Sequence, residues 1–437
     1  VGPIFYLTAR GTTRAAAENA LAILRDTEPE LHLRSVTLTA KDKICLCETR
    51  ECTPEACPYA NGYYARIKDA LWDMLDVPCL TAETLQEYAE RHTVCPFELG
   101  LDSSLWSDVI IGDYNYLFDP VVHLVRFFES AGDYIFLVDE AHNLPGRARE
   151  MHSAALTKTS FYEAKKLLGK GKSSLKNALT KVNDVFIEWR HRAEEESAAG
   201  DGRFGKTFFL KKRSEEFDRL LNRLCEPLEA WLDDHREPNE THTALLQLYF
   251  DVRAWLRVAD TFDDHFVLQI TASGSEVRAA QLCLDPSAFL ADSFALGRAA
   301  VLFSATLAPA RYYKDLCGVP EARAVALRSP FPAGNQGLFC IGNVSTRYKD
   351  RDASLAIVAE SLATMVRAHG GNYLAFFPSY AYMEQAYAQF KEHCPEINCI
   401  KQENAMDEQQ KAAFLAQFVP GPSQSLLGFA VMGGVFG

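Results

Sequence analysis

A short apolar run that ends in two carboxylates constrains the fold of this chain more than any other feature of its sequence. Residues Ile135–Val138 are all apolar, and Asp139, Glu140 and His142 follow them almost directly. Such a run is typical of a strand buried on both faces, as in parallel sheets. Side chains at the carboxyl end of such a strand lie where open α/β sheets bind ligands. The sequence therefore predicts an α/β fold with a functional site at this strand end.

Other short apolar runs continue this pattern along the chain. Pro330 and Pro332 mark a linker between two groups of predicted elements. The predicted fold class is α/β, with two parallel-sheet domains joined near residue 335. We expect further strands at residues 4–8, 36–39, 107–112, 266–271, 299–304, 338–341, 373–377 and 427–431, and helices at residues 13–25 and from about residues 354 and 380 onward.

Two stretches interrupt the first domain. One is rich in cysteine, proline, glycine and charge, and the other has a helical period with no strand-like run before about residue 265. Trp189, Trp231 and Trp255 are expected core residues of the helical stretch. We predict the first domain at residues 1–40, 101–153 and 265–335, the cysteine-rich insert at 41–100, the helical insert at 154–264 and the second domain at 336–437.

The composition excludes several classes of protein. Of 437 residues, 48% are hydrophobic, which is enough to bury the cores of roughly three domains. Every apolar run falls short of the ~18 residues that a membrane span needs. The 45 Lys and Arg against 58 Asp and Glu give a net charge of −13. This balance argues against a surface coated in positive charge for nucleic-acid binding, but it leaves room for a local basic groove.

The carboxylates after the apolar run suit nucleotide hydrolysis. Asp139 can hold Mg²⁺ against the phosphates of ATP, and Glu140 can orient or deprotonate the attacking water. The alternative is a strand that ends in a solvated acidic turn. The apolar strand running straight into Asp-Glu-Ala-His favours the nucleotide site.

Further motifs extend this interpretation. The sequence VDEAH resembles motif II of superfamily 2 helicases, and Ser304-Ala305-Thr306 resembles motif III. Residues 6–10, 371–379 and 431–437 resemble motifs Ia, IV and V, and residues 113–120 resemble a segment of the XPD/DinG family of iron–sulfur DNA helicases. This resemblance implies two RecA-like domains and an ATP-dependent DNA helicase that moves 5′ to 3′ on single-stranded DNA, with DNA repair as its setting.

The resemblance also implies roles for individual residues. The catalytic group is Asp139, Glu140 and His142, and the group that couples nucleotide state to the nucleic-acid track is Ser304, Ala305 and Thr306. The residues expected to contact nucleic acid are Thr8, Arg10, Tyr114, Asn115 and Ser379. Tyr114 and Asn115 can equally be core residues. The helical insert corresponds to the family's Arch domain, where Lys165, Lys166, Lys170, Lys172, Lys176 and Lys181 can follow phosphates or form a solvated face.

One stretch imitates a phosphate-binding loop. Residues 200–207 (GDGRFGKT) match the P-loop pattern, but polar, helical residues precede them where a buried strand is needed. We expect a basic loop there. In the resembled family the true Walker A motif precedes motif Ia and the motif VI arginines follow motif V. We therefore expect this sequence to be an internal piece of a longer enzyme, inactive alone.

Six of the twelve cysteines lie between Cys45 and Cys95. The spacing Cys45-x6-Cys52-x4-Cys57-x37-Cys95, with Cys47 and Cys79 as extras, suits a [4Fe–4S] cluster or Zn²⁺, and unligated thiols are a third possibility. The resemblance favours the iron–sulfur cluster as a brace for the wedge that splits duplex DNA, with Cys45 ahead of Cys47 as first ligand. The rival interpretation is a zinc-binding, cysteine-rich nucleic-acid scaffold without catalysis.

The cysteine content also bears on location. The first residues lack the basic and cleavable pattern of a signal peptide. Free thiols are typical of a reducing compartment. We expect a cytoplasmic protein whose partners are DNA and ATP, with no membrane contact.

Overall fold

The computed structural model describes residues 2–9, 11–28, 30–171, 173–199, 206–237, 239–406, 408–434 and 436. The chain forms two compact units, Val1–Val325 and Ala326–Gly437. The predicted α/β class with two parallel-sheet domains is confirmed. None of the helices in these described ranges is long and apolar enough to cross a membrane.

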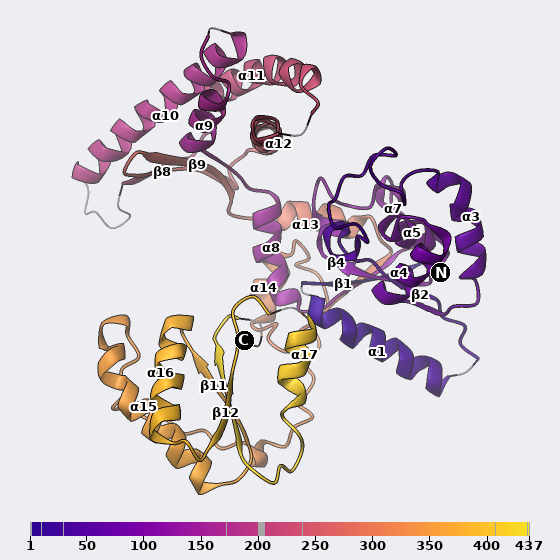
Figure 1. Ribbon diagram of the computed structural model, residues 1–437, viewed down its shortest axis with the longest axis vertical. Helices are drawn as coiled ribbons and strands as arrows, with labels where there is room; N and C mark the ends of the chain where they lie inside the picture. The colour runs from indigo at the N-terminus through magenta and orange to yellow at the C-terminus, as the bar shows by residue number, and fades with distance from the viewer. Residues whose placement is uncertain are drawn as a thin grey trace. The chain divides into compact units, whose positions relative to one another are not determined.

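A six-stranded parallel sheet forms the core of the first unit, in the order β10-β5-β1-β4-β2-β3 (Figure 1). Leu7 lies opposite Val138, and Thr8 lies opposite Asp113. The carboxyl ends of three central strands therefore share one edge. The strands are β1 (Ile4–Thr8), β2 (Ser35–Thr37), β3 (Cys79–Leu80), β4 (Val109–Asp113), β5 (Ile135–Val138) and β10 (Ala299–Leu302).

Helices cover this sheet because its central strands are apolar on both faces. Phe5, Phe136 and Val138 are fully buried in one continuous core. The helices of this part are α1 (Gly11–Thr27), α2 (Lys41–Ile44), α3 (Tyr63–Asp73), α4 (Ala82–His92), α5 (Pro96–Ser103), α6 (Asn115–Phe118), α7 (Val125–Phe128), α8 (Leu144–Met151), α13 (Ser287–Ala295) and α14 (Ala310–Leu316), with 3-10 turns η1 (Ser104–Trp106) and η2 (Ala141–Asn143).

The insert predicted to be helical contains a four-stranded antiparallel sheet, in the order β6-β9-β8-β7. The prediction that no strand precedes residue 265 is wrong. The strand expected at residues 266–271 pairs here and not in the parallel sheet. The strands are β6 (Ala154–Thr157), β7 (Thr207–Leu210), β8 (Phe266–Ser273) and β9 (Glu276–Cys283), and the helices are α9 (Lys158–Leu167), α10 (Ser174–Ala199), α11 (Glu215–Asp234) and α12 (Glu240–Thr261).

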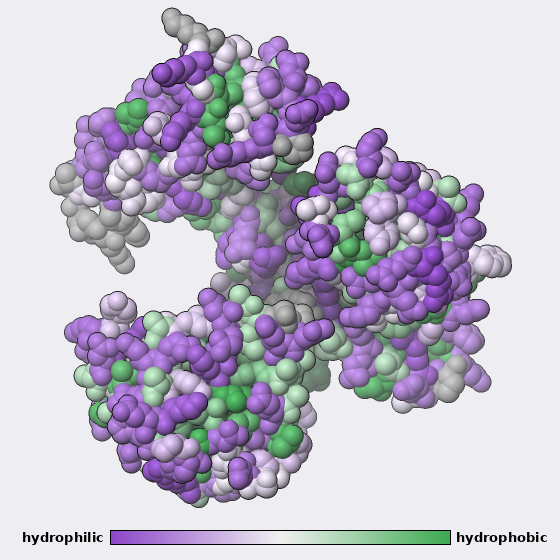
Figure 2. Space-filling view, viewed as in Figure 1, coloured by the Kyte–Doolittle hydropathy of each residue, from purple (hydrophilic) through white to green (hydrophobic). Residues whose placement is uncertain are grey.

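The physical reason for this difference is the short length of two strands. β6 and β7 have four residues each, too few to show a clear period beside long helices. In β8 the burial alternates along the strand, so one face packs against helices and the other does not. Trp189 and Trp255 are buried in this core and Trp231 is partly buried. Figure 2 shows a mainly hydrophilic outer face on this insert.

The second unit has a three-stranded parallel sheet in the order β11-β13-β12. The strand expected at residues 338–341 is absent from the described fold. Leu338 and Phe339 are exposed there without a strand partner. The strands are β11 (Asn372–Phe377), β12 (Asn398–Lys401) and β13 (Leu426–Val431), and the helices are α15 (Arg351–Ala368), α16 (Tyr380–His393) and α17 (Glu408–Ala416), with 3-10 turns η3 (Ala333–Asn335) and η4 (Tyr348–Asp350).

Candidate active site

The two carboxylates lie where β5 ends. The backbone N–H of Asp139 still bonds the Leu7 carbonyl at 2.9 Å, which continues the sheet by one residue. Glu140 then turns the chain with a φ of 49°. A positive φ is uncommon for residues other than glycine and recurs at functional sites. The carboxylate oxygen Oδ1 of Asp139 accepts the Glu140 N–H at 2.8 Å. The turn therefore fixes the Asp139 side chain at the sheet edge.

Two tyrosines hold Asp139 from neighbouring strands. The Tyr6 hydroxyl donates to Oδ2 of Asp139 at 3.1 Å, and the Tyr114 hydroxyl donates to the Asp139 carbonyl. Burial, and then the Asp139 carboxylate, raise the pKa of both phenols well above the usual range. Both hydroxyls therefore stay protonated and act as donors. Tyr6 belongs to residues 6–10, which resemble motif Ia, but it is not among the predicted site residues. Its place in that segment, two residues before Thr8, is the sequence signal that could have identified it.

Ser304 joins the turn after β10 to the carboxylate motif. Its hydroxyl donates to Oε2 of Glu140 at 2.9 Å and lies 2.8 Å from Nδ1 of His142. When the hydroxyl proton points to Glu140, the Ser304 oxygen accepts from His142 in the tautomer that carries its proton on Nδ1. His142 Nδ1 also lies 3.2 Å from Glu140 Oε2. The structure thus brings Ser304 to two predicted site residues, Glu140 and His142, from which it is 164 and 162 positions away in sequence.

The other two residues of this predicted coupling group lie beside the network rather than in it. The N–H of Thr306 donates to Ser304 Oγ at 3.2 Å, and the two hydroxyl oxygens are 3.4 Å apart. Ala305 and Thr306 are exposed. Thr306 therefore supports the Ser304 oxygen, while Ala305 has no polar group to contribute.

The residues expected to contact nucleic acid are dispersed. Thr8 is buried at the end of β1. Asn115 is half-buried and accepts from Arg147 at 3.4 Å. Ser379, in the second unit, caps α16 and accepts from Arg351 at 3.1 Å. Arg10 lies outside the described residues.

Tyr114, one of the residues predicted to contact nucleic acid, is buried. Its side chain has 0% exposure and packs edge-on against Phe118. A ring in this position has no free face on which an unpaired base can stack. The burial of Tyr114 fits the core alternative that its sequence position left open, and its hydroxyl donates to the Asp139 carbonyl.

The P-loop-like stretch ends in a strand. Residues 200–205 lie outside the described part of the chain, but Lys206 and Thr207 are inside it. The Lys206 carbonyl accepts the Ala272 N–H at 2.9 Å, and its amine pairs with Glu194 at 3.1 Å. Thr207 begins β7. A phosphate-binding lysine needs a helix opening after it, so this lysine is part of the antiparallel sheet instead.

The cysteines of the insert interact in two groups, one with Cys45, Cys47 and Cys57 and the other with Cys52 and Cys95. The sulfurs of Cys47 and Cys57 are 3.9 Å apart. Burial, and then the Cys57 and Cys45 thiols, raise the pKa of Cys47 to about 11. Lys41 interacts with two other cysteines of the insert, Cys52 and Cys95. Burial lowers the pKa of Lys41, but Glu98, followed by Cys52 and Cys95, raises it by more, so the net pKa is raised.

No set of three or more His, Cys, Asp or Glu side chains within the described ranges is arranged to hold a metal ion. The thiol donor set is nevertheless the one that iron–sulfur clusters use. All four predicted ligands, Cys45, Cys52, Cys57 and Cys95, carry free thiols in the described part of the chain.

Comparisons with known proteins agree with this geometry. The DEAD_2 family matches residues 28–161, and the helicase C-terminal domain family matches residues 362–437. A solved structure described as "XPD_Helicase" aligns with 99% of this chain and 73% of its own, with a TM-score of 0.52 and 16% identity, which shows a shared fold. Together, these matches indicate two helicase-type domains, the first of which carries the carboxylate motif at its sheet edge.

Curated relatives narrow the class. The chain is 25% identical over 376 residues to "General transcription and DNA repair factor IIH helicase subunit XPD" of Schizosaccharomyces pombe, covering 70% of this chain and 48% of that protein. It is 27% identical over 151 residues to "Regulator of telomere elongation helicase 1 homolog" of Caenorhabditis elegans, covering 34% and 14%. These relatives and the two matched domains support a likeness to the DinG/XPD family, and the chain spans less than half the length of either curated relative.

Proposed function

We propose that the complete protein is an ATP-dependent DNA helicase that moves 5′ to 3′ along single-stranded DNA. The observation that carries this proposal is the network joining Glu140 and His142 to Ser304, at the carboxyl edge of the parallel sheet, where such sheets usually bind ligands. The direction of movement rests on the family alone. DNA repair is the setting that the name of one relative supports.

Asp139 is the proposed holder of the nucleotide's Mg²⁺. Among the described residues, one hydrogen-bond donor reaches each of its two carboxylate oxygens, Glu140 N–H and the Tyr6 hydroxyl, and a carboxylate oxygen has a further lone pair. Hard cations such as Mg²⁺ prefer such oxygen ligands. When bound, Mg²⁺ would neutralise charge on the phosphates.

Glu140 is the proposed acceptor of the proton from the attacking water. Oε2 is engaged by Ser304 and His142, which leaves the second carboxylate oxygen for the water. A proton gained by Glu140 weakens its hold on the Ser304 hydroxyl, because a neutral acid is a poorer acceptor than a carboxylate. Ser304 would thereby report hydrolysis to residues 304–306, as the resemblance to motif III implies.

The DNA track is proposed to run past the ends of β1 and β4. Thr8 is the last residue of β1, Asn115 opens the helix after the neighbouring β4, and Arg10 follows Thr8 in sequence. Ser379 would add a contact from the second domain. The support for these roles is motif resemblance and position at strand ends, which are the usual ligand edge of parallel sheets.

A [4Fe–4S] cluster is the proposed occupant of the cysteine-rich insert, with ligands Cys45, Cys52, Cys57 and Cys95. The support is the thiol donor set and the 3.9 Å separation of the Cys47 and Cys57 sulfurs, which brings two thiols of the insert together. Bound in this way, the cluster would brace the insert against the force of strand separation. Unpaired thiols also suit the proposed cytoplasmic location.

Glutamine in place of Glu140 tests the function in the complete protein. Glu140→Gln is expected to retain ATP binding and to lower DNA-stimulated hydrolysis by roughly 100-fold or more, because an amide cannot accept the proton. Asp139→Asn should instead weaken Mg²⁺-dependent ATP binding. Glu129→Gln, at an exposed position, is the matched control. Full turnover by Glu140→Gln, or unwinding of only 3′-tailed duplexes by the unmodified protein, would contradict the proposal.

A further inference from the structure

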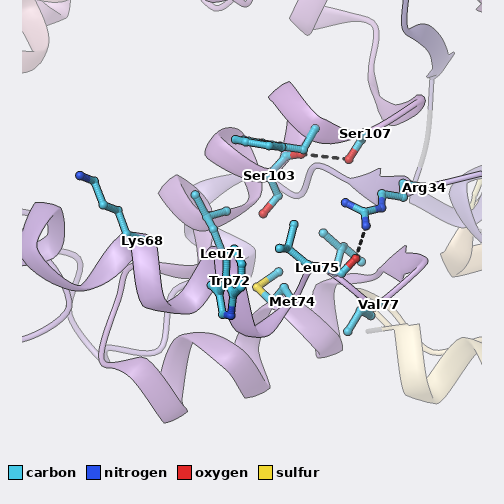
Figure 3. Close-up of a pocket in the computed structure, with 11 residues that line it drawn as sticks. Arg34, Lys68, Leu71, Trp72, Met74, Leu75, Val77, Ser103 and Ser107 are labelled. Carbon is cyan, nitrogen blue, oxygen red and sulfur yellow. Dashed lines mark hydrogen bonds between the residues drawn. The ribbon is translucent and has the colours of Figure 1, made fainter.

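A pocket lies in the first unit, away from the carboxylates of the candidate active site. It has a volume of about 240 Å³ and lies between the end of α3, the turn after α5 and the starts of β2, β3 and β4 (Figure 3). An engineered apolar cavity of about 150 Å³ holds benzene, and drug-sized ligands use roughly 300–1,000 Å³. This pocket therefore has room for one large side chain or one bicyclic ring.

The pocket opens at the opposite edge of the sheet from the candidate active site. Arg34, Val77 and Ser107 line it, and each precedes a strand of the parallel sheet. Asp139 and Thr8 lie at carboxyl ends. In a parallel sheet all amino ends share one edge and all carboxyl ends share the other. A DNA strand that follows the carboxyl ends therefore does not reach this pocket.

One buried polar group inside the pocket lacks a partner. Ser103 is 3% exposed, and within the described ranges its hydroxyl has no hydrogen-bond partner. Figure 3 shows this side chain extending from α5 toward Leu71 and Leu75. An unsatisfied buried hydroxyl costs about 1–3 kcal/mol, and native proteins keep few of them. A ligand that offers a hydrogen-bonding atom next to an apolar ring would satisfy it.

Exposed aromatic side chains flank the opening. Trp72 and Trp106 line the pocket, yet they are 78% and 64% exposed. Leu105, next to Trp106, is also exposed. Exposed tryptophan side chains in an apolar patch lower solubility. Tryptophan is also among the residue types enriched at protein-binding hot spots. The apolar surface therefore continues from the pocket onto the rim.

The charges of the pocket have one sign. Its two charged lining residues, Arg34 and Lys68, are both basic. Arg34 donates one N–H to the Leu75 carbonyl, and guanidinium has five donors. Asp108, the nearest acid in sequence to Ser107, already accepts the Arg34 backbone N–H at 2.8 Å. The rim thus complements carboxylates in a chain whose net charge is −13.

We propose that this pocket docks a partner protein by a single aromatic side chain flanked by acidic residues. The aromatic ring fills the cavity between Leu71, Leu75 and Trp106, and its polar atom meets Ser103. The flanking carboxylates face Arg34 and Lys68. This inference concerns another edge of the sheet and does not rest on the helicase activity.

Fluorine NMR of the intact protein labelled with 5-fluorotryptophan tests the docking site. The probe is the blocked peptide acetyl-Gly-Asp-Trp-Asp-Gly-amide, and Trp72→Phe and Trp106→Phe assign the two signals. We expect saturable shifts of these two signals, while the buried Trp255 signal stays unchanged. The peptide with lysines in place of its acids should bind more weakly, and the peptide with alanine in place of tryptophan should not bind.

Two variants examine the specific contacts. Ser103→Ala should weaken peptide binding by about two- to tenfold, the range of one hydrogen bond. Lys68→Glu should weaken it by about two- to fivefold, while Lys211→Glu, an equal charge change at an exposed site of the insert, should have no effect. Equal binding of the lysine peptide, or no saturable shift, would overturn the proposal. Shifts caused by a short oligothymidylate instead of the peptide would assign the pocket to nucleic acid and overturn it too.

Discussion

The hydroxyl of Tyr6 lies 3.1 Å from Oδ2 of Asp139, although 133 residues separate them in sequence. The contact exists because β1 and β5 are neighbours in the parallel sheet, with Leu7 opposite Val138. Tyr6 precedes Thr8, which belongs to the segment proposed to contact DNA. One hydrogen bond therefore links the proposed Mg²⁺-holding carboxylate to the strand that leads toward the DNA track.

Removing this hydroxyl should weaken the metal-dependent step. In the complete protein, Tyr6→Phe is expected to raise the Mg²⁺ concentration for half-maximal ATP hydrolysis by roughly tenfold, because a hydrogen bond to a charged group contributes about 1.5–3 kcal/mol. Tyr134→Phe is the matched control, since that hydroxyl donates at 2.9 Å to the Phe127 carbonyl instead. The same Mg²⁺ dependence in both variants would show that Tyr6 does not position Asp139.

Ser304 offers a separate test of coupling. Ser304→Ala removes the donor to Glu140 and the acceptor for His142, so we expect less duplex unwound per ATP hydrolysed, by roughly two- to tenfold from one lost hydrogen bond. The measurement is unwinding and hydrolysis in one reaction. Ser293→Ala, which removes a hydroxyl bonded to the Phe289 carbonyl, serves as the control. An unchanged ratio would place coupling elsewhere.

The sequence predicted the parallel strands and the carboxylate edge because a buried strand leaves a strong local signal. Ile135–Val138 and residues 373–377 are of this kind. It failed at β6 and β7, whose pairing with β8 and β9 depends on contacts across long sequence separations. It left two outcomes open for Tyr114, since a tyrosine at a strand end looks the same whether its ring is buried or free. Only the packing against Phe118 decides between these outcomes.

Asp218, in helix α11 of the first unit, makes stability depend on pH. It is 6% exposed, and burial raises the pKa of its carboxyl although Trp255 and Arg213 oppose the shift. With a raised pKa the folded state binds the proton more tightly than the unfolded state, so ionised Asp218 destabilises the fold at neutral pH and this penalty fades as pH falls. In the structure, Trp255 Nε1 donates to Asp218 Oδ1 at 2.9 Å. Asparagine in place of Asp218 keeps an oxygen that can accept this hydrogen bond.

We therefore expect Asp218→Asn to raise the free energy of unfolding at about pH 7.5 and to change it less at about pH 4.5. Denaturant unfolding at the two pH values is the measurement. Asp234→Asn, at an exposed acid at the end of the same helix α11, should show no such difference. A destabilised Asp218→Asn at the higher pH would mean that the Arg213 pairing outweighs the cost of burial.

The cysteine ligands can be separated by single substitutions in protein purified without oxygen. The proposed set predicts about four irons per chain, and Cys45→Ser, Cys52→Ser, Cys57→Ser or Cys95→Ser should each lose the brown chromophore and destabilise the insert, because metal binding contributes to folding. Cys47→Ser should keep the iron, and Cys79→Ser is a control thiol at the start of β3. Because the sulfurs of Cys47 and Cys57 are 3.9 Å apart, Cys47 is the alternative to Cys45 as the first ligand. Loss of iron in Cys47→Ser, with iron retained in Cys45→Ser, would move the first ligand by two residues. Zinc without iron in the unmodified protein would instead support the zinc-binding alternative.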